Sequence, residues 1–195
     1  DNPRSVGIIA LSVDDGDELI SAQLSTGTQE VFIATRSGMA IRFHEEDVRP
    51  MGRAARGVRG ISLSADDHVV STEIVDKEDL VLSISELGYG KRTPVDSYRL
   101  QTRGGKGVIN MKTTKKTGNV VAVLRVKETT DLMIITKDGK IIRIESDNIR
   151  QAGRSTQGVR LVRMEEGDAV AAASLVPEAG EEGEGENGQG DLALQ

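Results

Sequence analysis

The sequence predicts an all-β fold made of repeated units of about 50 residues, each a small four-stranded blade of the propeller type. Glycines recur at a fixed spacing, strand signals recur in the same order, and the composition suits short strands joined by tight turns. A single small sheet cannot bury its own face, so the units are expected to stack against one another as a partial propeller.

The glycine spacing defines the repeat. Two sets recur at offsets of 50 or 51 residues: Gly38, Gly88 and Gly139, and Gly7, Gly57, Gly107 and Gly158. The predicted units are residues 8–57, 58–107 and 108–158, with a partial unit at 159–176. An acidic, Gly- and Glu-rich tail follows at 177–195, where the composition predicts disorder.

Strand signals follow one order in each unit. An alternating run such as 58–63 precedes an apolar pair, which is 19–20, 69–70 or 120–121. A buried run then ends in a turn with a central glycine, which indicates a hairpin. The expected hairpin strands are 31–34 with 39–43, 80–82 with 89–93, and 132–135 with 140–144. The period of two places Arg42, Arg92 and Arg143 on the outward face of the last strand.

Composition excludes several classes of protein. Hydrophobic residues make up 37% of the chain but aromatics only 2%, so the core must be aliphatic. There is no cysteine for a disulfide or thiolate metal site, and no apolar run approaches the roughly 18 residues of a membrane helix. The first residues, Asp1 to Arg4, include neither an initiator methionine nor a signal peptide, so we expect a piece of a longer protein.

The charge distribution points to a polyanionic partner despite a net charge of −6. Six acidic residues lie in the tail from Glu178 onward, without a basic one. The windows 36–60, 89–116 and 137–163 hold 21 of the 25 lysines and arginines but only seven acidic residues. One edge of every blade is therefore expected to be basic.

Basic residues also match between units, which favours a continuous positive stripe over loops that are merely solvated. Arg49 matches Arg99 and Arg150, and Arg53 matches Arg103 and Arg154. The candidate DNA-binding residues are Arg42, Arg49, Arg53, Arg56, Lys91, Arg92, Arg99, Arg103, Lys106, Lys140, Arg143, Arg150 and Arg154.

Duplex DNA is the ligand that this stripe fits best. Phosphate contacts position a protein without reading sequence, and no recognition helix is predicted. The chain has only two phenylalanines and two tyrosines, too few for a stacking platform that binds single strands. Tyr89 and Tyr98 are expected to pack in the core, and His44 and His68 to lie on the surface without a metal.

A glycine-rich loop carries the most specific motif. Residues 101–107 are Gln101, Thr102, Arg103, Gly104, Gly105, Lys106 and Gly107. This loop resembles the box of the DNA gyrase A subunit, a Gln-basic-Arg-Gly-Gly-basic-Gly string, but has Thr102 where that family has a basic residue. Lys106 is not followed by Ser or Thr, which argues against a nucleotide-binding loop. An ordinary glycine turn between sheets remains the alternative for the glycines.

The resemblance extends over residues 4–176, through segments such as 14–20, 57–61, 88–93 and 156–159. It implies the later blades of the six-bladed β-pinwheel that forms the C-terminal domain of the DNA gyrase A subunit, which wraps DNA and ends in an acidic tail. Because that family has its box in the first blade, residues 101–107 are expected to be a box-like loop of a later blade. The tail is expected to compete with DNA for the basic edge.

The resemblance also implies partners and a cellular context. The partners would be duplex DNA and, in a heterotetramer that supercoils DNA with ATP in the bacterial cytoplasm, the gyrase B subunit together with the rest of the A subunit. No membrane is implied, and no catalysis, cofactor or metal is expected in this piece. The alternatives are the equivalent domain of the topoisomerase IV A subunit, whose box is degenerate, and a propeller that binds an acidic protein.

Overall fold

The computed structural model describes residues 7–53, 55–126 and 130–176, and the predicted acidic tail lies outside these ranges. Within them the regular elements are β-strands and three short 3-10 turns, which confirms the predicted all-β class. No helix in the described part of the chain could cross a membrane.

The strands are short and their hairpins lie where the sequence predicts them. They are β1 (Glu30–Thr35), β2 (Met39–His44), β3 (Val69–Val75), β4 (Leu80–Ser85), β5 (Tyr89–Pro94), β6 (Val108–Ile109), β7 (Val120–Val126), β8 (Asp131–Thr136), β9 (Ile141–Glu145), β10 (Val159–Arg160) and β11 (Val170–Val176). The 3-10 turns η1 (Glu45–Asp47), η2 (Val95–Ser97) and η3 (Ser146–Asn148) directly follow β2, β5 and β9.

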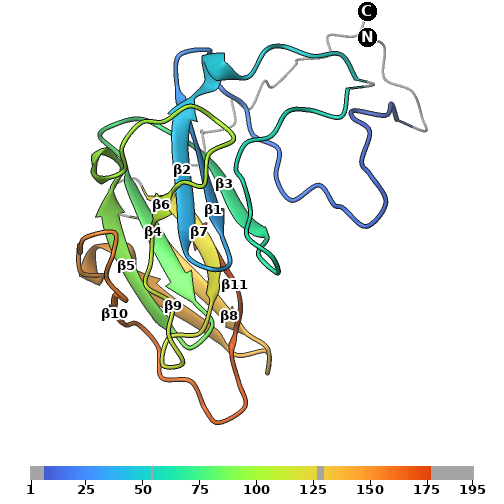
Figure 1. The fold of residues 1–195 in the computed structure, drawn as a ribbon. Helices are drawn as coiled ribbons and strands as arrows, with labels where there is room; N and C mark the ends of the chain where they lie inside the picture. Colours follow the sequence, from blue (N-terminus) through green and yellow to red (C-terminus); the bar gives the residue numbers. More distant parts are fainter. Residues whose placement is uncertain (1–6, 54, 127–129, 177–195) are drawn as a thin grey trace, which may run out of the picture.

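Three antiparallel sheets form three blades that stack side by side (Figure 1). The first blade has the strand order β3-β1-β2-β6, the middle blade β10-β5-β4-β7, and the last blade β11-β8-β9. The hairpins β1–β2, β4–β5 and β8–β9 lie at the centre of the first two blades and at one edge of the last.

The strands of one 50-residue unit do not form one sheet, contrary to the sequence prediction. In the first blade, β1 pairs with β3, which follows η1 in the chain. β2 pairs with β6, which follows the next hairpin, β4–β5. The middle blade is assembled in the same way from β4–β5, β7 and β10. Each unit thus contributes strands to neighbouring blades, which ties the stack together covalently.

The same topology explains two predicted strands that do not form. Residues 58–63 and the segment around Leu19 occupy the repeat positions of outer strands, but the hairpin with which they would pair is not among the described residues. Without that backbone partner they lie outside the sheets, and Leu19 and Ile20 are exposed. In Figure 1 these early segments loop away from the stacked blades.

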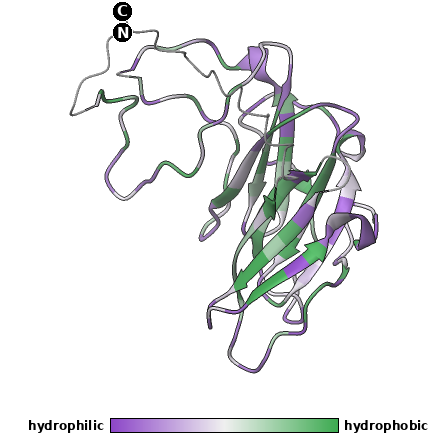
Figure 2. Ribbon diagram, turned by 180° about the vertical axis from the view of Figure 1, so that it is seen from behind, coloured by the Kyte–Doolittle hydropathy of each residue, from purple (hydrophilic) through white to green (hydrophobic). Residues whose placement is uncertain are grey.

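Apolar side chains form buried clusters between the blades. Figure 2 shows that the strands of the blades are coloured largely as hydrophobic. The ring of Tyr98 meets that of Phe32 edge-on at 4.8 Å between the first and middle blades. Leu82 and Ile134 belong to the aliphatic cluster of the next interface. Tyr89 and Tyr98 are buried, which confirms that they pack in the interior.

The recurring glycines permit the outermost strand to approach its hairpin closely. Gly107 has a φ of 74°, and a Cβ there would collide with the carbonyl oxygen of Ala40. Gly158 has a φ of 75° and lies in the same way against the carbonyl of Gly90. All seven recurring glycines have a positive φ, which favours glycine and accounts for the period seen in the sequence.

Candidate nucleic-acid interface

Three exposed arginines lie at equivalent places along one edge of the stack. Arg49, Arg99 and Arg150 each follow a 3-10 turn by two residues, after the end of β2, β5 or β9. Figures 1 and 2 show that these ends succeed one another along one side of the molecule. The three segments 49–53, 99–106 and 150–154 are called the rim below.

The later two rim segments are fixed to the preceding blade by backbone hydrogen bonds. The amide of Gln101 donates to the carbonyl of Arg42 at 2.9 Å, and the amide of Ala152 donates to that of Arg92 at 2.9 Å. Each segment therefore lies alongside the hairpin of the preceding blade. Because these hydrogen bonds are equivalent, Arg99 and Arg150 have the same position relative to their blades.

Arg103 and Arg154 combine a rim position with a structural role. The guanidinium of Arg103 donates to the carbonyls of Asp47 at 2.9 Å and Arg59 at 3.1 Å. Arg154 donates to the carbonyl of Ile109, the repeat equivalent of Arg59, at 3.2 Å. Both side chains are half-buried, so their removal would loosen the loops that they hold.

The box-like loop connects the turn after β5, in the middle blade, to β6 of the first blade. The amide of Gly104 donates to the carbonyl of Gly60 at 2.6 Å, and the carbonyl of Gly105 accepts from Ser62 at 2.9 Å. Gly104 has a φ of 81°, which favours glycine, and Lys106 is exposed at the rim. Thr102 is also exposed, so a basic residue would fit there.

Arg59 is a basic residue near the rim that sequence reasoning missed. It is exposed, and its carbonyl lies against Gly104 of the box-like loop. Its repeat equivalents are Ile109 and Arg160, so a search for positions that are basic in every unit passes over it. Arg53 and Arg56, which the sequence does single out, are both exposed as well.

The prediction that Arg42 faces outward is wrong. Only 5% of this residue is exposed, because the face opposite the apolar side chains of the first blade is covered by the middle blade. Its guanidinium pairs with Glu30 and donates to the carbonyls of Val95 at 2.8 Å and Tyr98 at 3.0 Å. Arg42 thus connects two blades inside the protein.

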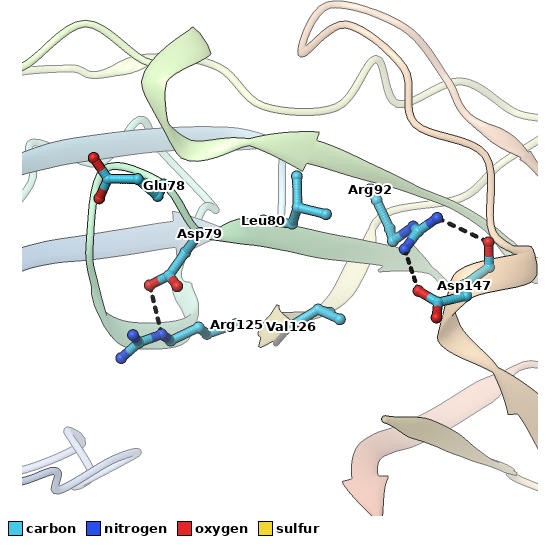
Figure 3. Close-up of a pocket in the computed structure, with 7 residues that line it drawn as sticks. All are labelled: Glu78, Asp79, Leu80, Arg92, Arg125, Val126 and Asp147. Atoms are coloured by element: carbon cyan, nitrogen blue, oxygen red, sulfur yellow. Dashed lines mark hydrogen bonds and ion pairs between the residues drawn. The ribbon is translucent and has the colours of Figure 1, made fainter. Parts of the chain in front are cut away.

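Arg92 makes the same kind of connection between the middle and last blades, so its predicted outward position is also wrong. It donates to the carbonyl of Ile149 at 2.7 Å and to the carboxylate of Asp147 at 2.8 Å. Figure 3 shows the guanidinium directed at the turn that carries Asp147, beside a cavity of about 540 Å³. The cavity has the ion pair of Arg125 with Asp79 at its other end.

Arg143 and Lys140 are exposed but lie apart from the rim. Arg143 has the repeat position of Arg42, and its side chain is 66% exposed because no further blade covers it among the described residues. Lys140 directly precedes β9, at the opposite end of this strand from Arg150. It pairs with Glu165 at 2.7 Å, and this interaction raises the pKa of its ammonium group.

Lys91 is buried, so its predicted place on the basic surface is wrong as well. The ammonium group donates to the carbonyls of Gly153 and Arg154, each at 2.6 Å, and thereby holds a rim segment. The other two units have isoleucine at this position, Ile41 and Ile142. Burial, with a smaller effect from the Arg154 cation, lowers the pKa of Lys91 to about 8.

We expect Lys91 to make the stability of the fold rise with pH. Below pH 8 the lysine is protonated in both states, and the folded protein bears the cost of a buried charge. Between about pH 8 and the unfolded value of 10.5 the unfolded chain binds more protons, so the free energy of unfolding increases. Urea unfolding at pH 7.5 and pH 10 should show this gain relative to Lys91→Met. A pH-independent difference between the two proteins would contradict it, and Lys115→Met, on an exposed turn, is the control.

The described residues contain no cluster of histidine, aspartate and glutamate able to hold a metal ion. His44 and His68 are exposed, as predicted. All four aromatic side chains of the protein are at most 6% exposed. The surface therefore has no aromatic ring on which a base could stack.

A family model for the DNA gyrase C-terminal domain, a β-propeller, matches residues 2–26, 29–76, 79–127 and 130–177. The DNA gyrase A subunit of Lawsonia intracellularis is 46% identical over 176 residues, which cover 89% of this chain and 22% of the relative. That of Haloquadratum walsbyi is 42% identical and that of Salmonella typhimurium 44%, over 96% and 90% of this chain. The chain spans about a fifth of the length of these relatives.

Solved structures agree with these sequence matches. The DNA gyrase A C-terminal domain superposes with a TM-score of 0.79 at 27% identity, over 87% of this chain and 58% of that one. The C-terminal domain of DNA topoisomerase IV superposes with a TM-score of 0.81 at 23% identity, over 86% of this chain and 52% of the other, a likeness of fold. From the family match over nearly its whole length and the identities above 40%, the chain belongs to the DNA gyrase C-terminal domain family of β-propellers.

Proposed function

We propose that the rim binds the phosphate backbone of duplex DNA without reading its sequence, and that the stacked blades bend the duplex along this edge. The observation that carries the proposal is the exposed trio Arg49, Arg99 and Arg150, one on each blade and all on the same edge. Evenly repeated cations suit the evenly repeated phosphates of a long duplex.

Two further features favour duplex over single-stranded DNA and over base readout. The aromatic rings are buried, so a single strand would lack the stacking contacts that such ligands use. The described rim consists of loops that follow the 3-10 turns, and it has no helix long enough to enter a major groove. Contacts from these loops would position the duplex without specifying its sequence.

The structure narrows the set of residues for this role. Arg42, Arg92 and Lys91 hold blades and loops together, and Lys140 is paired with an acidic residue at the other end of the strands. The cations proposed to contact DNA are Arg49, Arg53, Arg56, Arg59, Arg99, Arg103, Lys106, Arg150 and Arg154.

In the longer protein, we propose, this domain supports the ATP-dependent supercoiling of DNA by gyrase in the bacterial cytoplasm, within the assembly of A and B subunits. The gyrase relatives that match most of this chain support this context. DNA cleavage and ATP hydrolysis would lie outside this chain, whose part is to fix the path of the duplex. No cofactor is proposed for it.

Binding to linear duplex is expected to weaken steeply with salt. Each neutralised phosphate contributes about −0.9 to the slope of log K against log salt, so the three trio arginines alone give a slope of about −2.7. Fluorescence anisotropy with a labelled duplex at a series of salt concentrations measures it. An affinity that does not change with salt would refute phosphate binding, and an acidic protein that competes better than duplex would favour a protein-interaction role.

A further inference from the structure

A hollow of about 500 Å³ lies at the end of the middle blade where β4 turns into β5, away from the rim. Tyr89, the first residue of β5, faces Arg160 of β10 across the sheet. Lys116, which precedes β7, and Arg163, which follows β10, line the same hollow. Four segments of the chain thus bring one phenolic hydroxyl and three cations together.

The hydroxyl of Tyr89 has a proton left to donate. Nε and Nη2 of Arg160 donate to the tyrosine oxygen at 3.3 and 3.0 Å. A phenolic oxygen accepts such bonds through its lone pairs and keeps one O–H proton as a donor. No hydrogen bond among the described residues uses this proton. It is therefore available to a ligand in the hollow.

The three cations form no ion pair in the described part of the chain. Nζ of Lys116 and Cζ of Arg160 each lie 5.5 Å from the centre of the Tyr89 ring. The hydrogen bond from Arg160, assisted by the charges of both cations, lowers the pKa of the tyrosine hydroxyl. Surroundings that stabilise a phenolate also stabilise an anion that enters the hollow.

Acidic residues on the other wall of the hollow leave this positive charge largely uncompensated. Asp168 accepts hydrogen bonds from two backbone amides at 2.8 and 3.2 Å, and Glu165 pairs with Lys140 at 2.7 Å. The third carboxylate, that of Glu166, is on an exposed residue and is solvated. Two of the three carboxylates are thus already engaged, whereas the three cations are not.

The first blade shows that the fold does not require this cluster. Its equivalent hollow, of about 390 Å³, is lined by Met39 and Ile109, which face each other at the repeat positions of the tyrosine and the arginine. Asp66 has the repeat position of Lys116, so this charge is reversed there. The same backbone accepts an apolar pair, and packing alone therefore does not account for the cations of the middle blade.

We propose that the hollow of the middle blade binds a small phosphate-bearing anion, with Tyr89, Lys116, Arg160 and Arg163 as its donors. Guanidinium and ammonium groups form strong, charge-assisted hydrogen bonds to phosphate oxygens. Three cations match a dianion or a pyrophosphate better than the single charge of a DNA phosphodiester. This site goes beyond the proposed contacts of the rim with duplex DNA, and a phosphate of the DNA backbone is the other source that the test must separate.

Titration calorimetry with sodium pyrophosphate should show saturable binding at one site, and sodium chloride of equal ionic strength should show none. Tyr89→Phe keeps the ring and removes the O–H, so the affinity should fall about tenfold, the loss of one hydrogen bond to a charged group. Arg160→Ile, which introduces the residue that the first blade has, should cause at least that loss. Circular dichroism should show both variants folded.

The first blade provides the matched control. Lys112 has the repeat position of Arg163 and lines the apolar hollow. Arg163→Gln should weaken pyrophosphate binding about tenfold, for the same loss of a charged contact, and Lys112→Gln should leave it unchanged. Absence of saturable binding, or equal losses in these two variants, would overturn the proposal.

A linear duplex is the second arm of the experiment. Tyr89→Phe and Arg160→Ile should change the affinity for duplex by no more than about twofold at 0.1 M salt, since charges away from the rim are screened. A loss of duplex affinity as large as the loss of pyrophosphate affinity would place the hollow in the DNA interface. The separate anion site would then be refuted, whereas failure of the rim to bind duplex would leave it standing.

Discussion

Replacing Arg49, Arg99 and Arg150 together by glutamate is expected to weaken duplex DNA binding by about 500-fold or more at 0.1 M salt. Three lost phosphate contacts remove about 2.7 from the salt slope, which corresponds to that factor between 1 M and 0.1 M salt. The added carboxylates repel the duplex and increase the loss. Anisotropy titration with a duplex of about 40 base pairs measures the affinity.

The fold should survive this change, since the three side chains are exposed and the backbone of their loops is held by other groups. That distinguishes the trio from Arg103 and Arg154, whose guanidinium groups bond to neighbouring carbonyls. The three single variants should each cause part of the loss. One single variant that accounts for all of it would indicate a local site in place of a continuous rim.

A matched triple variant controls for net charge. Lys115, Lys137 and Arg163 are exposed and lie near the hairpin-turn end of the strands, away from the rim. Their replacement by glutamate changes the net charge by the same six units. Binding should fall far less than in the rim variant, because contacts beyond a Debye length of about 10 Å are screened. Equal losses would mean that only overall charge matters.

The sequence alone predicts the hairpins well. Their strands are local, and glycine turns separate runs of the right length, so β1–β2, β4–β5 and β8–β9 fall close to the expected ranges. Which strands join each hairpin depends on contacts between residues far apart in the chain, for which no local signal exists. The pairing of β3, β7 and β11 with the hairpins of earlier blades could therefore not be predicted from the sequence.

The predicted outward orientation of Arg42 was wrong for a related reason. Alternation predicts that residues opposite an apolar face meet solvent, but this holds only where one face of a sheet is covered. Blades in a stack are covered on both faces, so the opposite face of β2 is also buried. Arg143 has the same local pattern yet is exposed, because the environment differs while the sequence signal is the same.

Arg42→Ala is expected to lower the free energy of unfolding by about 3–5 kcal/mol, the cost of breaking a buried ion pair. The substitution leaves the carboxylate of Glu30 buried without its partner and deprives the carbonyls of Val95 and Tyr98 of a donor. Urea unfolding monitored by circular dichroism measures the loss. Arg143→Ala, at the same repeat position but exposed, should cost about 1 kcal/mol or less.

The double variant Arg42→Met with Glu30→Leu separates the two causes of this loss. Apolar residues of similar size remove the unpaired charge, and replacements of this kind are often neutral or stabilising. Much of the stability lost in Arg42→Ala should then return, apart from the contribution of the two carbonyl hydrogen bonds. If the double variant is as unstable as the single one, the carbonyl bonds between blades, and not the ion pair, are what Arg42 supplies.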